Sequence, residues 1–274
     1  MMTIREYKRA ESLEEAWQLN QKRPNRVLGG MIWLKMENIN VGTAIDLSGL
    51  GLDTIEETDE GFSIGAMVTL RQLELHEGLA AYNEGAVRES VRHIVGVQLR
   101  NLATVGGSIY SRFGFSDVLT MFLALNASVE LYKGGVVPLA EYAQRPYDRD
   151  ILVRVLVPKE NARFVYQSVR NSQTDFPVLT CAAAKLADGS IRAAIGARPG
   201  KAVLYTAEPQ AGRPPRPSPP ATGRSSTAEP SSWSPPSPPV IRCISPTCSS
   251  PTGPPSPWSS PSPPGNPPCL STPP

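Results

Sequence analysis

The composition of the chain changes abruptly near Glu208, and this break limits what can fold. Of the 29 prolines in 274 residues, 23 lie at or after Pro209. From Ala207 onward there are six charged residues and almost no aliphatic runs. Such a segment cannot bury enough apolar surface to offset its chain entropy. We therefore expect a folded body over residues 1–206 and a disordered Pro/Ser-rich tail over residues 207–274.

The charges of the body balance, which argues against a nucleic-acid partner. Of 27 basic and 25 acidic residues, 23 of each precede Ala207. The first residues, MMTIREYKRAESLEEAW, lack the apolar core of a signal peptide, and no apolar stretch approaches the ~20 residues of a membrane span. The sequence thus predicts a cytoplasmic protein without a membrane span.

Side chains that carry out metal or acid–base chemistry are scarce. Cys181 lies in the apolar run VLTCAAAKL, which favours a small buried thiol over a reactive one. The tail cysteines have no histidine beside them to complete a zinc site. His76 and His93 fall on predicted helices, where a surface or helix-end role is favoured. We expect no metal and no catalytic residue.

The first part of the body alternates helix and strand signals. Ser12-Leu-Glu-Glu15 is a capping box opening EEAWQLNQ, and RVLGG and AIDLS indicate strands, so residues 1–57 read as one lobe. A second lobe, residues 58–160, begins with strand-like GFSIGAMV and a capping box at Thr69–Gln72. The pattern then predicts a helix over residues 79–95, a strand and turn in LRNLATVGGSI, a helix from Ser116 or Asp117, and two strands, ASVELYKGG and DILVRVLVP.

A third α+β unit, residues 161–206, is predicted to be incomplete. ARFVYQSVR, FPVLTCAAAKL and SIRAAIGA alternate as strands, with Asp188-Gly189 as a hairpin turn, but no helix follows to cover the sheet. The amino-acid composition of the tail, dominated by Pro and Ser with Arg and Cys, resembles the product of a GC-rich gene translated in a wrong frame, so we favour a frameshift. The alternative is a flexible interaction tail whose PxxP repeats form polyproline II ligands.

Two glycine pairs are the candidate phosphate sites. Leu28-Gly29-Gly30-Met31 follows a strand, and Thr104-Val105-Gly106-Gly107-Ser108 repeats the pattern with flanking hydroxyls. Adjacent glycines can adopt positive φ and expose bare amides to a phosphate, although an ordinary tight turn would explain the first pair equally well. Neither pair fits the P-loop or the Rossmann pattern. Asp117 suits either a ribose or adenine contact or a helix N-cap.

The order of these segments resembles a known family. Gly29-Gly30, then QLRNLATVGGSI over residues 98–109, Ser116-Asp117, and LALNASVEL over residues 123–131 are similar to the FAD-binding (medium) subunit of molybdenum hydroxylases. These are relatives of xanthine dehydrogenase, aldehyde oxidoreductase and carbon monoxide dehydrogenase. The resemblance covers residues 1–206.

The resemblance implies an α+β, two-lobed FAD-binding fold of the vanillyl-alcohol-oxidase (PCMH) type, followed by a C-terminal α+β domain. It implies an oxidoreductase subunit whose FAD takes electrons from an iron–sulfur subunit, beside a molybdopterin-binding subunit, and passes them on, often to NAD. Asp117 would hold the adenosine part. The pyrophosphate would contact Leu28, Gly29, Gly30, Met31, Ile32, Trp33, Thr104, Val105, Gly106, Gly107 and Ser108.

The chain also departs from the family pattern. Met31-Ile32-Trp33 replaces the usual continuation Thr-Asp-Leu, which removes a hydroxyl and an acid, and Ser108 replaces an asparagine. A cationic contact to the flavin would fall to Arg170, for which a solvated strand-end charge is the favoured alternative. Two other functions stay open: a stand-alone flavin reductase of the UDP-N-acetylenolpyruvoylglucosamine reductase type, and a non-functional frameshifted fragment.

Overall fold

The chain divides into two units in a computed structural model, Met1–Pro215 and Arg216–Pro274. The structure describes residues 1–197 and 200–209, all of which belong to the first unit. The predictions of a disordered tail, a frameshift and polyproline II ligands therefore lie outside the described residues, except at residues 207–209.

The first sheet is parallel, because its strands are joined by crossovers. Its order is β1 (Thr3–Arg9), β3 (Asn40–Asp46), β2 (Arg26–Leu28), and α1 (Leu13–Asn20) packs against it. The Ser12 hydroxyl accepts the Glu15 amide at 3.1 Å, as the capping pattern predicts. The Glu15 carboxylate accepts the Glu11 amide at 2.8 Å instead of that of Ser12, so the box is only half formed.

The second sheet is antiparallel and has five strands. Its order is β4 (Ile55–Glu57), β5 (Gly61–Gly65), β8 (Leu152–Pro158), β6 (Ser128–Leu131), β7 (Gly135–Pro138). Between β5 and β6 come α2 (Leu70–Leu75), α3 (Glu77–Tyr82), α4 (Ala86–Arg92), α5 (Val97–Arg100), α6 (Val105–Tyr110) and α7 (Asp117–Ala124), and α8 (Leu139–Tyr142) follows β7. Thr69 caps α2 in the predicted capping box.

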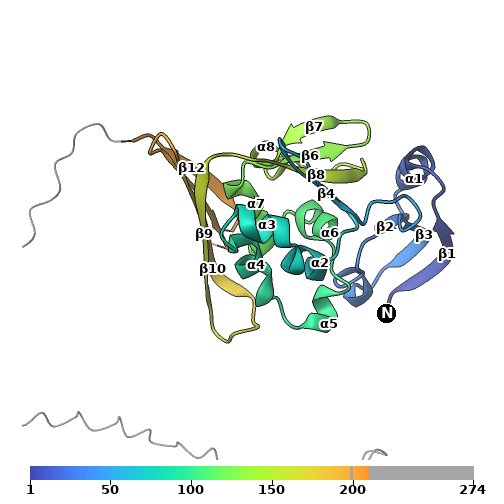
Figure 1. Ribbon diagram of the computed structural model, residues 1–274. Coiled ribbons are helices and arrows are strands. Elements are labelled where there is room, and N and C mark those ends of the chain that lie inside the picture. Colours follow the sequence, from blue (N-terminus) through green and yellow to red (C-terminus); the bar gives the residue numbers. More distant parts are fainter. Residues whose placement is uncertain (198–199, 210–274) are drawn as a thin grey trace, which may run out of the picture. The chain divides into compact units, whose positions relative to one another are not determined.

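The third sheet is an antiparallel meander with helices on one face. Its order is β12 (Val203–Ala207), β11 (Ile191–Gly196), β10 (Pro177–Leu186), β9 (Ala162–Arg170). Helix α7 packs on β10 and β11, and α4 packs on β9 (Figure 1). Up to residue 209 no helix follows these strands, as the sequence predicts, but one face is nevertheless covered, because α4 and α7 come from earlier in the chain. On the other face Val165, Val169, Ile191 and Tyr205 are exposed, and Cys181 is half-buried, not buried as predicted.

The core explains why the three sheets form one unit. Every residue of α7 is buried, and the helix shares one apolar cluster with strands of the second and third sheets. A smaller cluster joins Ile45 of β3 to Val153 of β8. The division into lobes at residues 57 and 160 stays a prediction. Side chains from both sides of residue 57 pack together in the smaller cluster.

Two predicted elements are wrong. Residues 79–95 form two helices, because Glu84 (φ 53°) and Gly85 (φ 81°) are left-handed and interrupt the α-helix. Instead of a strand and turn, LRNLATVGGSI contains the second half of α5 and nearly all of α6. The glycine pair lies in the first turn of α6, where packing outweighs its low helix propensity.

Candidate functional site

The segment after β2 presents unpaired backbone amides. The strand ends at Leu28, and a 3-10 helix, η1 (Leu34–Met36), follows. Between them, the amides of residues 30–33 donate no hydrogen bond to any residue that the structure describes. Met31, with φ of 56°, is the left-handed residue of this segment, whereas neither Gly29 nor Gly30 has a positive φ. Successive free N–H groups in such a turn form a concavity that suits an anion.

The second glycine pair has its amides occupied. Val105 and Gly106 donate to the carbonyl groups of Val68 and Ala66, at 2.8 and 2.9 Å. Gly107 donates to the Thr104 hydroxyl at 3.1 Å, and Ser108 donates to the Thr104 carbonyl at 3.1 Å. The expectation of bare amides is therefore wrong for this segment. The amides of Val105 and Gly106 hold the start of α6 against the turn between β5 and α2, and the other two close the first turn of α6 itself.

The two glycine pairs lie side by side although more than 70 residues separate them. A β-carbon on Gly29 would lie 3.0 Å from the Thr104 hydroxyl and 3.9 Å from the Cα of Gly107. A β-carbon on Gly30 would lie 2.6 Å from the carbonyl carbon of Leu102. Gly30 is therefore required for the close approach of two protein segments, a reason different from the ligand contact that the sequence suggested.

Asp117 is the first residue of α7, directly after Ser116, whose hydroxyl donates to the Ser108 carbonyl of the second glycine segment at 3.1 Å. The Asp117 side chain is buried, with 5% of the residue exposed, and its Oδ1 accepts hydrogen bonds from the Tyr166 hydroxyl at 2.5 Å and from the Arg170 guanidinium. Burial raises the pKa of the Asp117 carboxyl, against the lowering effect of Tyr166 and Arg170. Ser116 is the N-cap, and its hydroxyl accepts the Leu119 amide at 3.2 Å. The role of Asp117 toward adenosine stays a prediction.

Arg170 is not the solvated strand-end charge that the sequence favoured. Its side chain is 8% exposed and pairs with Asp117, 53 residues earlier. The same guanidinium donates to the carbonyl of Asp175 at 2.6 Å. Arg170 thus connects the start of α7 to the turn between β9 and β10.

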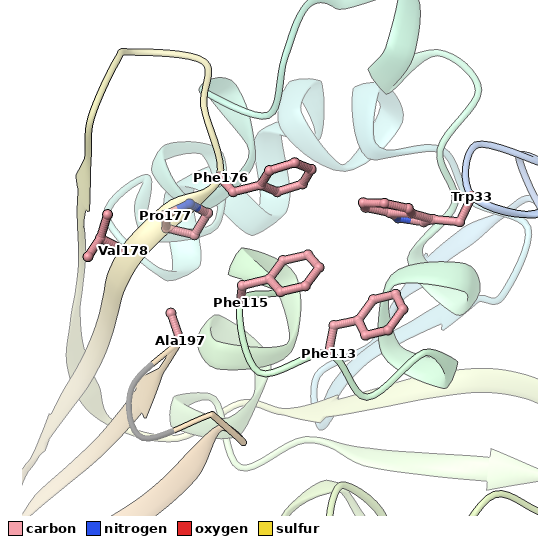
Figure 2. A pocket seen from close by; sticks show the side chains of 7 residues that line it. All are labelled: Trp33, Phe113, Phe115, Phe176, Pro177, Val178 and Ala197. Atoms are coloured by element: carbon pink, nitrogen blue, oxygen red, sulfur yellow. The ribbon is translucent and has the colours of Figure 1, made fainter. Parts of the chain in front are cut away.

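An aromatic pocket of about 570 Å³ lies beside the first glycine segment. Figure 2 shows four aromatic side chains directed into one space from three separate segments. Trp33 belongs to the predicted site, and the other residues were missed, although the paired phenylalanines of RFGFSD were visible in the sequence. The lining consists of Trp33, Phe113, Phe115, Phe176, Pro177, Val178 and Ala197.

A buried cation holds the segment that carries two of these rings. Arg112 is left-handed (φ 49°), its side chain is 4% exposed, and its Cζ lies 4.0 Å from the ring centroid of Tyr142 and 4.9 Å from that of Tyr147. Asp148 lies 3.8 Å away, too far for a hydrogen bond. The cation–π contacts fix Arg112 and, through it, the start of the turn at Phe113.

Other kinds of site find no support in the described part of the chain. Across residues 1–197 and 200–209, no three His, Cys, Asp or Glu side chains gather into a metal site. No helix in the same ranges has the length and apolar character needed to cross a membrane.

Comparison with known proteins gives one family and a consistent set of relatives. Residues 2–160 match the family model described as the FAD binding domain in molybdopterin dehydrogenase. The protein YgfM of Escherichia coli (strain K12) is 26% identical over 212 residues, which cover 76% of this chain and 80% of YgfM. The glyceraldehyde dehydrogenase medium chain of Sulfolobus acidocaldarius is 26% identical over 193 residues, covering 65% of this chain and 68% of that one.

Solved structures show the same fold at low sequence identity. Carbon monoxide dehydrogenase from Hydrogenophaga pseudoflava matches with a TM-score of 0.66 and 22% identity, covering 73% of this chain and 76% of that chain. Quinoline 2-oxidoreductase from Pseudomonas putida 86 matches with a TM-score of 0.65 and 21% identity, with the same coverage.

The residues present suit FAD at the first glycine segment. A dinucleotide carries a charged pyrophosphate, and the free amides of residues 30–33 are the donors that such a group needs. The second segment adds no free amide from residues 105–108. The first glycine segment therefore offers backbone donors to the pyrophosphate, whereas the amides of residues 105–108 in the second segment are already occupied.

Proposed function

Because the chain belongs to the family of FAD-binding domains of molybdopterin dehydrogenases, we propose that it is the electron-transfer subunit of a multi-subunit molybdenum hydroxylase. Electrons arrive from iron–sulfur clusters of one partner subunit, beside a second partner that binds molybdopterin, and leave to NAD or another acceptor. The names of the relatives support such partners: one is called a medium chain, and one is a carbon monoxide dehydrogenase described by its molybdenum cofactor.

The free amides at residues 30–33 carry this proposal. They lie where the first sheet meets α6, since Gly29 faces Thr104 and Gly107 there. On this assignment Gly30, Met31, Ile32 and Trp33 bind the pyrophosphate through their backbone. The loss of the family's usual hydroxyl and acid at positions 31 and 32 then matters little, because backbone donors do not depend on the side chain.

The remaining predicted contacts have narrower roles. Leu28 ends the strand that leads into the segment, and Val105, Gly106 and Ser108 position α6 through their amides. Asp117 would bind adenosine through Oδ2, because Oδ1 already accepts from Tyr166 and Arg170. FAD, when bound, supplies one- and two-electron transfer, so the chain needs no general acid or base of its own.

A titration of the full chain tests the cofactor assignment. We expect FAD and ADP, which share a pyrophosphate, to bind and raise the melting temperature, and FMN to bind much more weakly. A ligand at 100 times its Kd adds about 2.7 kcal/mol to the free energy of unfolding. A chain that binds neither FAD nor ADP would contradict the proposal.

Isolation of the intact complex tests the partners and the acceptor. Affinity-tagged chain purified from its own cells should carry iron and molybdenum, measured by mass spectrometry of the metals, and flavin absorbance. Adding NADH should bleach that absorbance if NAD is the acceptor. A purified chain that carries flavin without iron or molybdenum, and that shows turnover by itself, would favour a stand-alone reductase.

A further inference from the structure

Strand β9 is the longest of the strands that lie at the edge of a sheet. The three sheets end in β1 and β2, in β4 and β7, and in β9 and β12. Strand β9 runs over nine residues and, in the part of the chain that the structure describes, pairs with β10 alone. An edge strand presents a row of unpaired N–H and C=O groups, with which another strand can form hydrogen bonds.

The register of β9 with β10 identifies the backbone groups that face the open edge. In an antiparallel pair, every second residue exchanges its hydrogen bonds with the neighbouring strand, and the residues between them direct their groups away from it. The Ala187 amide donates to the Asn161 carbonyl at 3.1 Å, so the odd-numbered residues of β9 bond to β10. The N–H and C=O groups of Phe164, Tyr166 and Ser168 therefore point out of the sheet.

The other edge strands carry features that discourage pairing, and β9 does not. Strands β2 and β4 have three residues each, β7 has four and ends at Pro138, β12 has five and leads into Pro209, and four of the seven residues of β1 are charged. Short strands, charges and proline all protect an edge. In β9 the six residues Phe164–Val169, FVYQSV, contain neither charge nor proline. Such a segment of high β propensity favours pairing.

We propose that β9 pairs in antiparallel orientation with β9 of a second copy of this chain, so that the third sheets of the two copies become one continuous sheet. Most homodimers have two-fold symmetry. With the axis perpendicular to the sheet at Tyr166, the backbone of Tyr166 faces its counterpart, and Phe164 faces Ser168 of the second copy. This register brings together the residues whose N–H and C=O groups point to the edge.

The sequence of β9 is complementary to itself in this register, which selects a second copy as the occupant. Arg163 lies opposite Val169, and Arg170 lies opposite Ala162, so no charged residue of one β9 faces a charged residue of the other. Like charges directly opposite each other would destabilise the pair. Val169 is 59% exposed in one copy and gains the aliphatic stem of Arg163 as a cross-strand neighbour.

Sedimentation velocity of the full chain tests this interface, and we expect a dimer that dissociates on dilution. Val165 and Gln167 face each other across the two-fold axis, and both are exposed in one copy. Two double variants therefore place like charges opposite each other: Val165→Lys with Gln167→Lys, and Val165→Glu with Gln167→Glu. Each should raise the Kd of the dimer roughly tenfold or more. An equimolar mixture of the two should form a heterodimer, because each lysine then faces a glutamate.

The matched control is Val165→Lys with Gln167→Glu, which changes the same two positions but places opposite charges across the axis, and should remain a dimer. Hydrogen exchange of the unaltered chain is a readout that needs no variant. The amides of Phe164, Tyr166 and Ser168 should become more protected as the concentration rises.

Three results would overturn the inference. The first is a chain that stays monomeric at every concentration. The second is a dimer that the like-charge variants form as tightly as the control does. The third is protection of the three edge amides that does not depend on concentration, because this would show that the edge is covered within one copy.

Discussion

The carbonyl group of Leu102 occupies the space that a side chain on Gly30 would need. This contact joins the turn after β2 to the segment before α6, and so fixes the free amides beside the second glycine pair. The glycine is required by the packing of protein on protein, in a backbone conformation with negative φ that other residues also adopt.

We therefore expect Gly30→Ala to destabilise the protein by about 1–3 kcal/mol, because backbone atoms on both sides must move. Gly107→Ala is the matched control. Gly107 is exposed, and a β-carbon there would meet only the Thr104 hydroxyl, at 3.1 Å. Urea unfolding of both variants measures the difference, and equal losses would show that the Gly30–Leu102 contact adjusts freely.

Neutralising Asp117 should be costly, because it leaves the buried guanidinium of Arg170 without its carboxylate. We expect Asp117→Asn to lose about 3–5 kcal/mol of unfolding free energy. Replacing both partners, as Asp117→Asn with Arg170→Met, should lose less than the sum of the single changes. Denaturant unfolding of the four proteins gives the coupling, and strict additivity would contradict a direct interaction.

Acid should weaken the contact between α1 and the turn that joins β6 to β7. Glu14 accepts hydrogen bonds from Lys133 at 2.7 Å and from Tyr132 at 2.8 Å, and these, with Gln18, lower its pKa from 4.5 to about 2. A lowered carboxyl pKa contributes stability above pH 4.5, and this contribution is lost as the pH falls toward 2.

The measurement is the free energy of unfolding of wild type and Glu14→Gln between those two pH values. We expect the wild type to lose more than the variant across this interval. High salt should reduce the difference, since the groups are exposed to solvent. Parallel pH profiles would show that Glu14 makes no such contribution.

Removing the hydroxyl of Thr104 should loosen the start of α6. That oxygen accepts the Gly107 amide, so Thr104→Val is expected to lose about 1 kcal/mol. Thr104→Ser keeps the acceptor and should stay near wild type. Hydrogen exchange at the Gly107 amide provides a local readout, and unchanged protection in Thr104→Val would rule out the cap.

The amino-acid sequence determined the features that depend on neighbouring residues. Ser12, Thr69 and Ser116 cap helices through hydrogen bonds that span three residues, and each was recognisable from its local pattern. The family resemblance also located the FAD-binding fold, which the family match and the solved structures confirm. The start of α6 was missed because Thr104 lacks a Glu or Gln three positions on and because two glycines favour a turn.

Only the tertiary structure decided the relationships that cross the chain. It assigned Asp117 to Arg170, joined Gly30 to Leu102, and gathered Trp33, Phe113 and Phe176 around one pocket. Local pattern cannot specify these pairs, because each depends on how segments that are distant in the sequence approach one another in the folded chain. The sequence therefore suggested a ligand contact or a helix cap for the carboxylate of Asp117. In the folded chain this carboxylate accepts a hydrogen bond from the buried guanidinium of Arg170, 53 residues later.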